Sequence, residues 1–317
     1  MPTVSIIMAT YNRSNYVGEA IESVLAQDFK DWELVLVNDG STDDTEEIVR
    51  SYTQVDPRIR YFRKENERNL ALVRNFGLAR AKGDFVAFLD DDDRWLPNKL
   101  SRQISLMEFH PEIGMCYTRF QVYRSDETGL VPTKSFPEFL AVTFEELFLA
   151  FVPPSTVLMR KSCLDQTGWF DPQYRLSEDF DMWIRFSQRW KVAAIDEALT
   201  FTVMDGRNHE GKDPMKVWKA TAEIVKNLQL IPEYANRKGY VKLQFARRIY
   251  EGGRIYCDLG QYWMAAIHFA RAIWIAPLVG MAVRRSGEKA GDILIRILKA
   301  YVAVPICIFK GLIHGRH

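Results

Sequence analysis

The sequence predicts an α/β fold, a mixed and mostly parallel sheet flanked by helices, followed by a region that is helical throughout. Two patterns carry this prediction. Over roughly the first 110 residues, continuous apolar runs alternate with stretches whose apolar residues recur every three or four positions, which is typical of strand–helix–strand units. From Pro214 onward the helical spacing continues almost without interruption. We therefore expect an α/β unit at 1–213 and a helical unit at 214–317.

The elements of the first unit follow in chain order. Continuous apolar runs predict buried strands at 4–9 and 32–37, and further strands are expected at 59–63, a short one, and at 84–89. Between them, the spacing predicts helices at 17–25, after the capping residues Ser41 and Thr42, at 70–81, and from Pro97. Farther along, we expect strands at 113–123, 155–160 and 191–203, and helices opened by the capping box Thr143–Glu146 and by Ser177.

Composition argues against several classes of function. The chain has 317 residues, is 47% hydrophobic and carries a formal net charge of +1, so its charge balance does not point to nucleic acid. The four cysteines form no CxxC pair and are expected as buried thiols in a reducing compartment. The start does not resemble a secretory signal, and no apolar stretch is long enough to span a membrane. We therefore expect a cytoplasmic protein.

Four consecutive carboxylates, Asp90 to Asp93, follow the apolar run at 84–89. Ligands of open α/β sheets bind outside the carboxyl ends of the strands, where this run lies. Adjacent carboxylates repel one another, and a divalent cation reverses the sign of that interaction. Mg²⁺ and Mn²⁺ suit oxygen ligands, and Mg²⁺ commonly combines one or two carboxylates with substrate phosphates. The alternative is a solvated turn, or acids that favour the N-terminus of the helix at Pro97.

Aromatic and acidic groups also follow the first two strands. The strand at 4–9 runs into Thr10 and Tyr11, and Asp39 follows the strand at 32–37. Tyr11 offers a face on which a base can stack, and Asp39 can accept a hydrogen bond from a base or a ribose. An isolated Asn-Asp-Gly segment is usually just a turn. Together with the acidic run, these strand ends suit a nucleoside diphosphate.

Two further acids, Glu178 and Asp179, fall in the first turn of the helix expected after Ser177. They could simply favour the helix dipole. They could also include a carboxylate that the helix end keeps ionised, ready to accept a proton from a hydroxyl as a general base does. The residues alone leave both interpretations open.

Four segments, in this order, resemble a known family. SIIMATYN, VNDGSTDDT, RNFGLARAKGDFVAFLDDDD and SEDFDMWIR are similar to the successive signatures of inverting nucleotide-sugar glycosyltransferases of family 2. The resemblance covers roughly residues 2–210 and implies the Rossmann-like GT-A fold. It also implies transfer of a sugar from a nucleotide diphosphate donor, UDP in the first place, to a hydroxyl of a glycan or lipid-linked acceptor in polysaccharide biosynthesis.

The resemblance implies a metal site and a diphosphate site. The Asp-x-Asp signature falls on Asp90, Asp91 and Asp92, which would bind the donor, and Asp90 and Asp92 would hold Mn²⁺ or Mg²⁺. Arg207 and His209 loosely match a loop that lies near the diphosphate in relatives, with His209 as a further metal ligand. The alternative for that loop is an ordinary polar connection.

The resemblance also implies where the nucleoside lies. Tyr11 and Asp39 fall where relatives hold the uracil and the ribose, and Ala9 and Thr10 would line the same pocket. Arg74 is similar to a helix arginine that reaches the donor.

Asp179 falls on the catalytic base of the family, with Glu178 beside it. In the mechanism this implies, Asp179 deprotonates the acceptor hydroxyl, which attacks the anomeric carbon from the face opposite the leaving group. One displacement inverts the configuration. The two acids therefore need not form the close carboxylate pair of a retaining hydrolase.

The helical region contains one repeat-like pattern, at about 249–277. The offsets of one tetratricopeptide repeat are met by Gly253, Tyr256, Gly260, Tyr262, Ala265, Phe269, Ala272 and Pro277. No second copy follows. A single helical hairpin must bury its apolar face on the rest of the chain or on a partner.

The tail at about 284–317 is both apolar and basic. Residues 278–317 carry seven Lys and Arg against two Asp and Glu, a net charge of +5. This favours an amphipathic helix on an anionic surface at the inner face of the cell membrane. The alternative is a helix packed on the first unit or in a homodimer interface.

Two other functions compete with sugar transfer. A nucleotidyltransferase uses a related sheet and metal site, but it is expected to have a glycine-rich basic loop after the first strand. This chain has ATYNRSNY there, with one arginine and no glycine. A non-catalytic scaffold could act through the helical hairpin. It would have no use for Asp39, Asp92 and Asp179.

Overall fold

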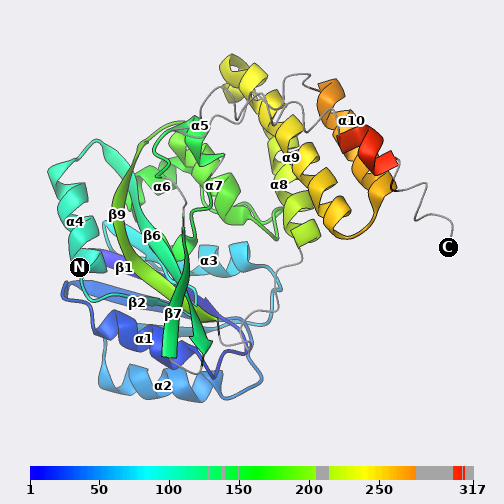
Figure 1. Ribbon diagram of the computed structural model, residues 1–317. Helices are drawn as coiled ribbons and strands as arrows, with labels where there is room; N and C mark the ends of the chain where they lie inside the picture. Colours follow the sequence, from blue (N-terminus) through cyan, green and yellow to red (C-terminus); the bar gives the residue numbers. More distant parts are fainter. Residues whose placement is uncertain are drawn as a thin grey trace. The chain divides into compact units, whose positions relative to one another are not determined.

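The computed structural model describes residues 1–126, 129–136, 140–148, 150–204, 214–275, 303–308 and 310. The chain divides into two compact units, Met1–Glu210 and Gly211–His317, which are described separately below. The first unit contains the sheet, and the second is helical (Figure 1).

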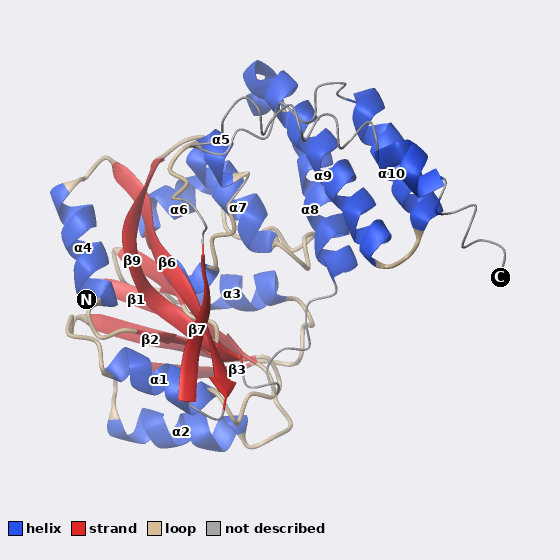
Figure 2. Cartoon of the chain, in the orientation of Figure 1, coloured by secondary structure: helices blue, strands red, loops and turns tan. Residues whose placement is uncertain are grey.

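Within the described residues, the first unit is built on a nine-stranded sheet of order β3-β2-β1-β4-β8-β6-β9-β5, with β7 paired to β6. The strands are β1 (Val4–Thr10), β2 (Trp32–Asn38), β3 (Ile59–Arg63), β4 (Phe85–Phe88), β5 (Asp93–Trp95), β6 (Ile113–Asp126), β7 (Gly129–Phe136), β8 (Val157–Arg160) and β9 (Lys191–Met204). The first four run parallel. Beyond them β8 runs antiparallel to β4 and to β6. Strand β6 runs parallel to β9, and the two lie side by side in Figure 2. This is the mixed α/β sheet that the sequence predicts.

Helices cover both faces of the parallel part of the sheet. In the first unit they are α1 (Val17–Leu25), α2 (Thr45–Val55), α3 (Leu70–Leu78), α4 (Lys99–Phe109), α5 (Phe144–Leu147), α6 (Lys161–Thr167) and α7 (Glu178–Ser187), with a 3₁₀ turn at Pro154–Thr156. Ile6 and Met8 of β1 share one core with α1, α2 and α4. Ile7 points to the other face, where Gly77 of α3 approaches so closely that a Cβ there would lie 2.7 Å from the Ile7 Cγ2.

Several local expectations need correction. Neither Ser41 nor Thr42 caps α2, which begins at Thr45. Instead the Asp43 carboxylate accepts a hydrogen bond from the Thr45 backbone N–H at 3.1 Å. The helix expected at 70–81 ends at Leu78. Ser177 precedes α7 but has φ 62° and makes no side-chain cap. The capping box of Thr143 and Glu146 is confirmed at the start of α5.

The sequence did not predict β5 and β7, because neither has a local signal. β5 consists of Asp93, Arg94 and Trp95 and pairs antiparallel with Thr200–Thr202 of β9. Two of its three residues have charged side chains, so the sequence contains no apolar run that would predict a strand here. The pairing nevertheless draws the last aspartate of the acidic run into the sheet.

The second unit contains α8 (Pro214–Leu228), a 3₁₀ turn at Pro232–Arg237, α9 (Lys238–Asp258) and α10 (Tyr262–Ile275). The α9–α10 connection turns at Gly260, whose φ of 71° suits glycine. A Cβ on Gly253 would lie 2.7 Å from the Phe269 ring, so this glycine lets the two helices approach closely. Pro277 lies outside the described residues. None of the helices in the described part of the chain has both the length and the apolar character needed to cross a bilayer.

The four cysteines are free thiols, and Cys116, Cys163 and Cys307 are buried. Cys307, in the short described segment 303–308, packs on α10 against Ala265, Ala266 and Phe269. Its Sγ lies 3.1 Å from that of half-buried Cys257.

A lysine is fully buried in the core of the first unit. Lys99 Nζ on α4 donates to Gln103 Oε1 at 2.6 Å and lies 4.1 Å from the centre of the Trp95 ring. Burial lowers the pKa of Lys99 to about 7, whereas a lysine in an unfolded chain keeps its proton up to about pH 10.4. Between these values the unfolded state binds more protons, so this group makes the free energy of unfolding rise with pH. Below about pH 7 the burial penalty is present in full.

Replacing Lys99 by methionine should therefore stabilise the protein. The gain at pH 7 should be about 1–2 kcal/mol, because the lost hydrogen bond to Gln103 offsets part of the relieved burial penalty. Thermal unfolding between pH 6 and 10 would measure it, with the exposed Lys82→Met as control. The contribution of Lys99 to the rise in stability with pH should vanish in Lys99→Met and persist in the control. A Lys99→Met protein less stable than the parent at pH 7 would contradict this account.

Candidate functional site

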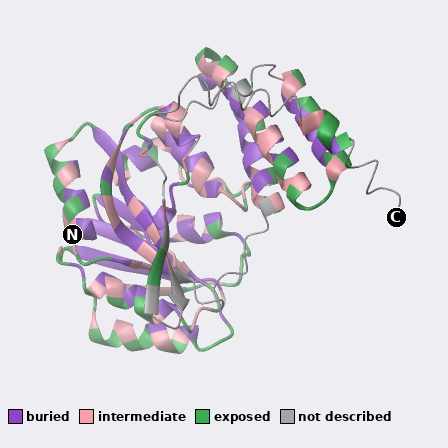
Figure 3. Ribbon diagram, in the orientation of Figure 1, coloured by how far each residue is buried: buried purple, intermediate pink, exposed green. Residues whose placement is uncertain are grey.

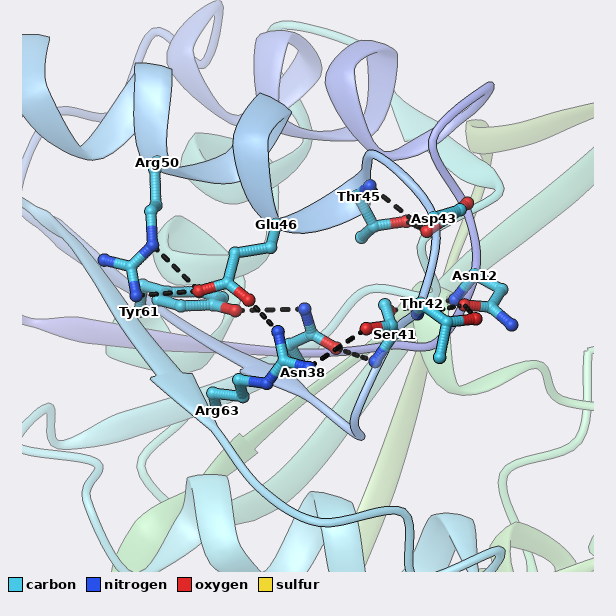
Figure 4. A network of polar contacts seen from close by, with 10 residues as sticks. All are labelled: Asn12, Asn38, Ser41, Thr42, Asp43, Thr45, Glu46, Arg50, Tyr61 and Arg63. Atoms are coloured by element: carbon cyan, nitrogen blue, oxygen red, sulfur yellow. Dashed lines mark hydrogen bonds and ion pairs between the residues drawn. The ribbon is translucent and has the colours of Figure 1, made fainter.

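The loops that follow β1 and β2 brace each other at the carboxyl edge of the sheet (Figure 4). Asn12, at φ 51°, donates from its backbone to Ser41 Oγ at 2.9 Å and accepts from the Thr42 backbone at 2.8 Å. Asn38 accepts from the Ser41 backbone at 2.8 Å and donates to the Tyr61 hydroxyl at 3.0 Å. These bonds hold the two loops in fixed positions, so the groups beside them are preorganised.

Asp39 follows β2 at this edge and is buried. Its backbone N–H donates to the Thr10 carbonyl at 2.9 Å, which joins the ends of β1 and β2. Its Oδ1 accepts from the Glu67 backbone N–H at 2.9 Å. Burial raises the pKa of Asp39, while the backbone N–H groups of Glu67 and Arg68 oppose the rise. Next to it, Thr10 is buried, Ala9 is half-buried and the Tyr11 ring is exposed.

The acidic run forms a tight turn, and the Ser155 hydroxyl bonds to both of its ends. The Asp93 backbone donates to the Asp90 carbonyl at 3.1 Å. Ser155 Oγ accepts from the Asp90 backbone at 3.0 Å and donates to Asp93 Oδ2 at 2.5 Å. Thr202 of β9 donates to the Asp92 carbonyl at 3.1 Å. The backbone of the turn is thus fixed by the 3₁₀ turn before β8 and by β9.

The four carboxylates of the turn lie in different environments. Asp91 and Asp93 are buried, whereas Asp90 and Asp92 are half-buried. Burial, with the charge of Asp92, raises the pKa of Asp91 to about 7, and Arg13 at 3.4 Å opposes the rise. Burial also raises the pKa of Asp93 well above its usual value. The two outer carboxylates of the Asp-x-Asp signature are therefore the ones that reach solvent.

Arg74 joins two of the predicted segments. Its guanidinium, buried on α3, donates to Asp90 Oδ1 at 2.6 Å and to Glu178 Oε1 at 2.5 Å. Burial alone would lower the pKa of Arg74, but the charges of the surrounding carboxylates, Asp179 among them, raise it. Asp179 is half-buried, and its Oδ1 accepts from the Phe180 backbone at 2.8 Å. The acidic turn after β4 and the start of α7 are far apart in sequence, and both bond to the Arg74 guanidinium.

In the described part of the chain, no three His, Cys, Asp or Glu side chains form a ready-made metal cluster. The donor set still fits a hard cation that keeps one or two carboxylates and takes further oxygens from phosphates. Asp90 and Asp92 are the half-buried acids of the run. Arg207 and His209 lie outside the described residues.

Three groups at this edge were not predicted as site residues. Arg13 faces Asp91, Ser155 holds the acidic turn, and the backbone at Glu67–Arg68 contacts Asp39. Ser155 had no local signal, because its contact depends on the antiparallel pairing of β8 with β4. The sequence shows Arg13 in the loop after the first strand, but it does not show that Asp91 is the partner of this side chain.

Comparison with known proteins places the chain in a family. The family model described as "Glycosyl transferase family 2" matches residues 5–168, slightly more than half of the chain. The chain belongs to glycosyl transferase family 2. Three of the four segments that carry the resemblance lie within the matched residues, and SEDFDMWIR, at 177–185, lies beyond them.

Named relatives of the family agree with this assignment. The putative teichuronic acid biosynthesis glycosyltransferase TuaG of Bacillus subtilis is 34% identical over 229 residues, 70% of this chain and 88% of TuaG. An uncharacterized glycosyltransferase of Rickettsia bellii is 33% identical over 214 residues, 67% of this chain and 30% of that protein. The chain thus spans about a third of the length of the Rickettsia bellii, felis and conorii relatives.

Solved structures agree with the fold. S. aureus TarS 1–349 in complex with UDP-GlcNAc matches with a TM-score of 0.68 and 18% identity, over 100% of this chain and 93% of that one. The mannosyltransferase PcManGT from Pyrobaculum calidifontis, in complex with GDP-Man and Mn²⁺, matches with a TM-score of 0.58 and 16% identity, over 96% and 87%. The family 2 chain described here therefore has the GT-A fold.

Proposed function

We propose that this family 2 glycosyltransferase moves a sugar from a UDP-sugar to a hydroxyl of a glycan or lipid-linked acceptor, with inversion at the anomeric carbon. The observation that carries the proposal is the Arg74 bridge from Asp90 to Glu178. It brings the end of β4, where a donor diphosphate would bind, to the start of α7, where the candidate base lies. Donor binding and removal of the proton from the acceptor hydroxyl would then take place at neighbouring positions in one site.

The nucleoside part of the donor would lie at the ends of β1 and β2. Asp39 would accept from the base or the ribose, and the exposed ring of Tyr11 would stack on the base. Ala9 and Thr10 would line this pocket beside them. The hydrogen-bonded loops of Figure 4 would hold these groups in place before the donor arrives, which lowers the entropic cost of binding.

Asp90 and Asp92 would hold Mn²⁺ or Mg²⁺ together with the donor phosphates. When bound, the cation supplies positive charge beside the leaving diphosphate. The PcManGT complex, which contains Mn²⁺, supports this choice of cofactor. Asp91 would contribute through its contact with Arg13 by joining the acidic turn to the β1 loop. Arg207 and His209 stay predicted ligands of the diphosphate side.

Asp179 would accept the proton of the acceptor hydroxyl, since it is half-buried in the first turn of α7, where the helix favours its ionised form. Glu178 is a positioning residue in this scheme: it is buried and bonded to Arg74, so it orients the turn that carries Asp179. Inversion then needs one displacement and no covalent intermediate.

The acceptor would be a saccharide on a lipid carrier or a growing glycan at the inner face of the cell membrane. The TuaG relative, a putative teichuronic acid biosynthesis enzyme, supports a cell-surface polymer. The basic sequence of the tail at about 284–317 supports a site of action at an anionic membrane surface. The tail lies outside the described residues except for 303–308 and 310.

A panel of nucleotide sugars tests the proposal directly. Each donor is incubated with the full chain, Mn²⁺ and a lipid-linked saccharide extract, and nucleoside diphosphate release is measured. One UDP-sugar should be turned over, with at least a 100-fold loss when EDTA replaces Mn²⁺ (roughly the scale of losing electrostatic stabilisation of a leaving group). The product linkage, read by NMR, should be inverted. Turnover with a retained configuration, or full turnover in EDTA, would contradict the mechanism.

A further inference from the structure

Helix α10 of the second unit exposes a nearly continuous apolar stripe. On α10 the exposed residues are Trp263, Met264, Ile267, Ala270, Arg271 and Trp274, spaced as one face of a helix. The opposite face, with Ala265, Phe269 and Ala272, is buried (Figure 3). We call the first set the α10 outer face. It is apolar except for Arg271, and its large side chains are exposed rather than packed in the core that the described part of the unit forms.

The tryptophans of the protein are distributed unevenly. The chain has eight, and six of them are buried or half-buried. The two exposed ones are Trp263 and Trp274, at 48% and 85%, and both belong to the α10 outer face, with Ile267 at 50% between them. Tryptophan is the residue that concentrates at membrane–water interfaces, because its ring is apolar and its N–H is polar.

Charge is also divided unevenly between the two units. Residues 211–317 carry 18 Lys and Arg against 7 Asp and Glu, a net charge of +11, and residues 1–210 carry 24 against 34, a net charge of −10. An anionic surface therefore attracts the helical unit and repels the catalytic one. Each basic residue near an anionic bilayer contributes about 1 kcal/mol. Two helical units of this charge repel each other, which disfavours a second copy as the occupant of the face.

We propose that the α10 outer face lies in the plane of an anionic lipid surface, with Trp263, Ile267 and Trp274 in the headgroup region. α10 has 14 residues, about 21 Å at 1.5 Å per residue, so it is suited to lie on a bilayer rather than to cross it. Two exposed tryptophans and a basic unit together favour lipid over a soluble polyanion, which would need only the charge. The inference concerns binding alone and does not depend on the transferase activity.

Vesicle co-sedimentation of the full chain tests this surface. Vesicles contain phosphatidylcholine with or without 30% phosphatidylglycerol, and the variant is Trp263→Gln/Trp274→Gln. The parent should bind the anionic vesicles, and the variant should bind at least about 10-fold more weakly. Phe109→Gln removes an exposed ring (81%) from the first unit, and this variant should bind like the parent. Because all three side chains are exposed, circular dichroism and thermal melting should show the variants folded.

Tryptophan fluorescence gives an independent readout. Acyl-brominated anionic lipids should quench part of the parent emission, and that quenched part should be absent in the double variant. Unchanged vesicle binding by the double variant would overturn the proposal and leave the tail as the only contact. So would equal binding to vesicles without phosphatidylglycerol. Dimers of the parent that the double variant dissociates, without vesicle binding by either, would show instead that the face joins two copies.

Discussion

Replacing Arg74 by methionine is expected to destabilise the first unit by about 3 kcal/mol or more, because it removes the guanidinium that pairs with the buried Glu178 carboxylate, and breaking a buried ion pair from one side is costly. Asp90 contributes less, since about a third of its side chain is exposed. For a unit of this size the melting temperature should fall by roughly 6–12 °C. Differential scanning calorimetry measures the change.

The matched control is Arg80→Met, an arginine just past the end of the same helix whose guanidinium donates to the Phe76 carbonyl. It should cost about 1 kcal/mol or less. Adding Glu178→Gln to Arg74→Met removes the buried charge that Arg74 pairs with and should restore at least half of the lost stability. If Arg74→Met melts within about 2 °C of the parent, the bridge does not hold the two segments together.

Asp179→Asn should lower kcat for nucleoside diphosphate release at least about 100-fold, since it removes the general base while keeping the size of the side chain. The donor KM should change little, because Asp179 would contact the acceptor and not the nucleotide. Steady-state and single-turnover kinetics with the donor identified by the panel separate the two effects.

Asp165→Asn is the control, an exposed carboxylate on α6 paired with Lys161, and should keep the parental kcat. Glu178→Gln should show a different pattern from Asp179→Asn, with a lower melting temperature as well as lower turnover, because it removes the negative charge that pairs with Arg74. Parental turnover in Asp179→Asn would remove this residue from the mechanism.

Much of the fold could be predicted from sequence because its signals are local. Strands β1, β2 and β4 are buried on both faces, so each is a nearly continuous apolar run. The helices between them carry their period within one or two turns. Strand β5 could not be predicted, because a strand of Asp93, Arg94 and Trp95 has no apolar pattern of its own and forms through its pairing with β9. Helix ends were displaced where a side chain such as Asp43, rather than the expected hydroxyls, satisfied the first N–H groups.

The residues of the candidate site also fall into those that local sequence signals predict and those that only the fold brings together. Strand-end acids such as Asp39 and Asp90 could be found because parallel strands bring their carboxyl ends to one edge. Their partners could not, because the contacts of Ser155 with Asp90 and of Arg13 with Asp91 join residues distant in sequence. Sequence reasoning assigned Arg74 to the donor. In the structure both ends of its guanidinium bond to carboxylates, which adds a structural role that no spacing rule could reveal.

Calorimetric titration of UDP, with and without Mn²⁺, tests the central claim most directly: Asp39, Asp90, Asp92 and Asp179 serve one nucleotide-sugar site. The account predicts Mn²⁺-dependent binding that is retained in Asp179→Asn and weakened at least about 10-fold in Asp92→Asn and in Asp39→Asn. UDP binding that is indifferent to Mn²⁺ and unchanged in both of those variants would contradict it.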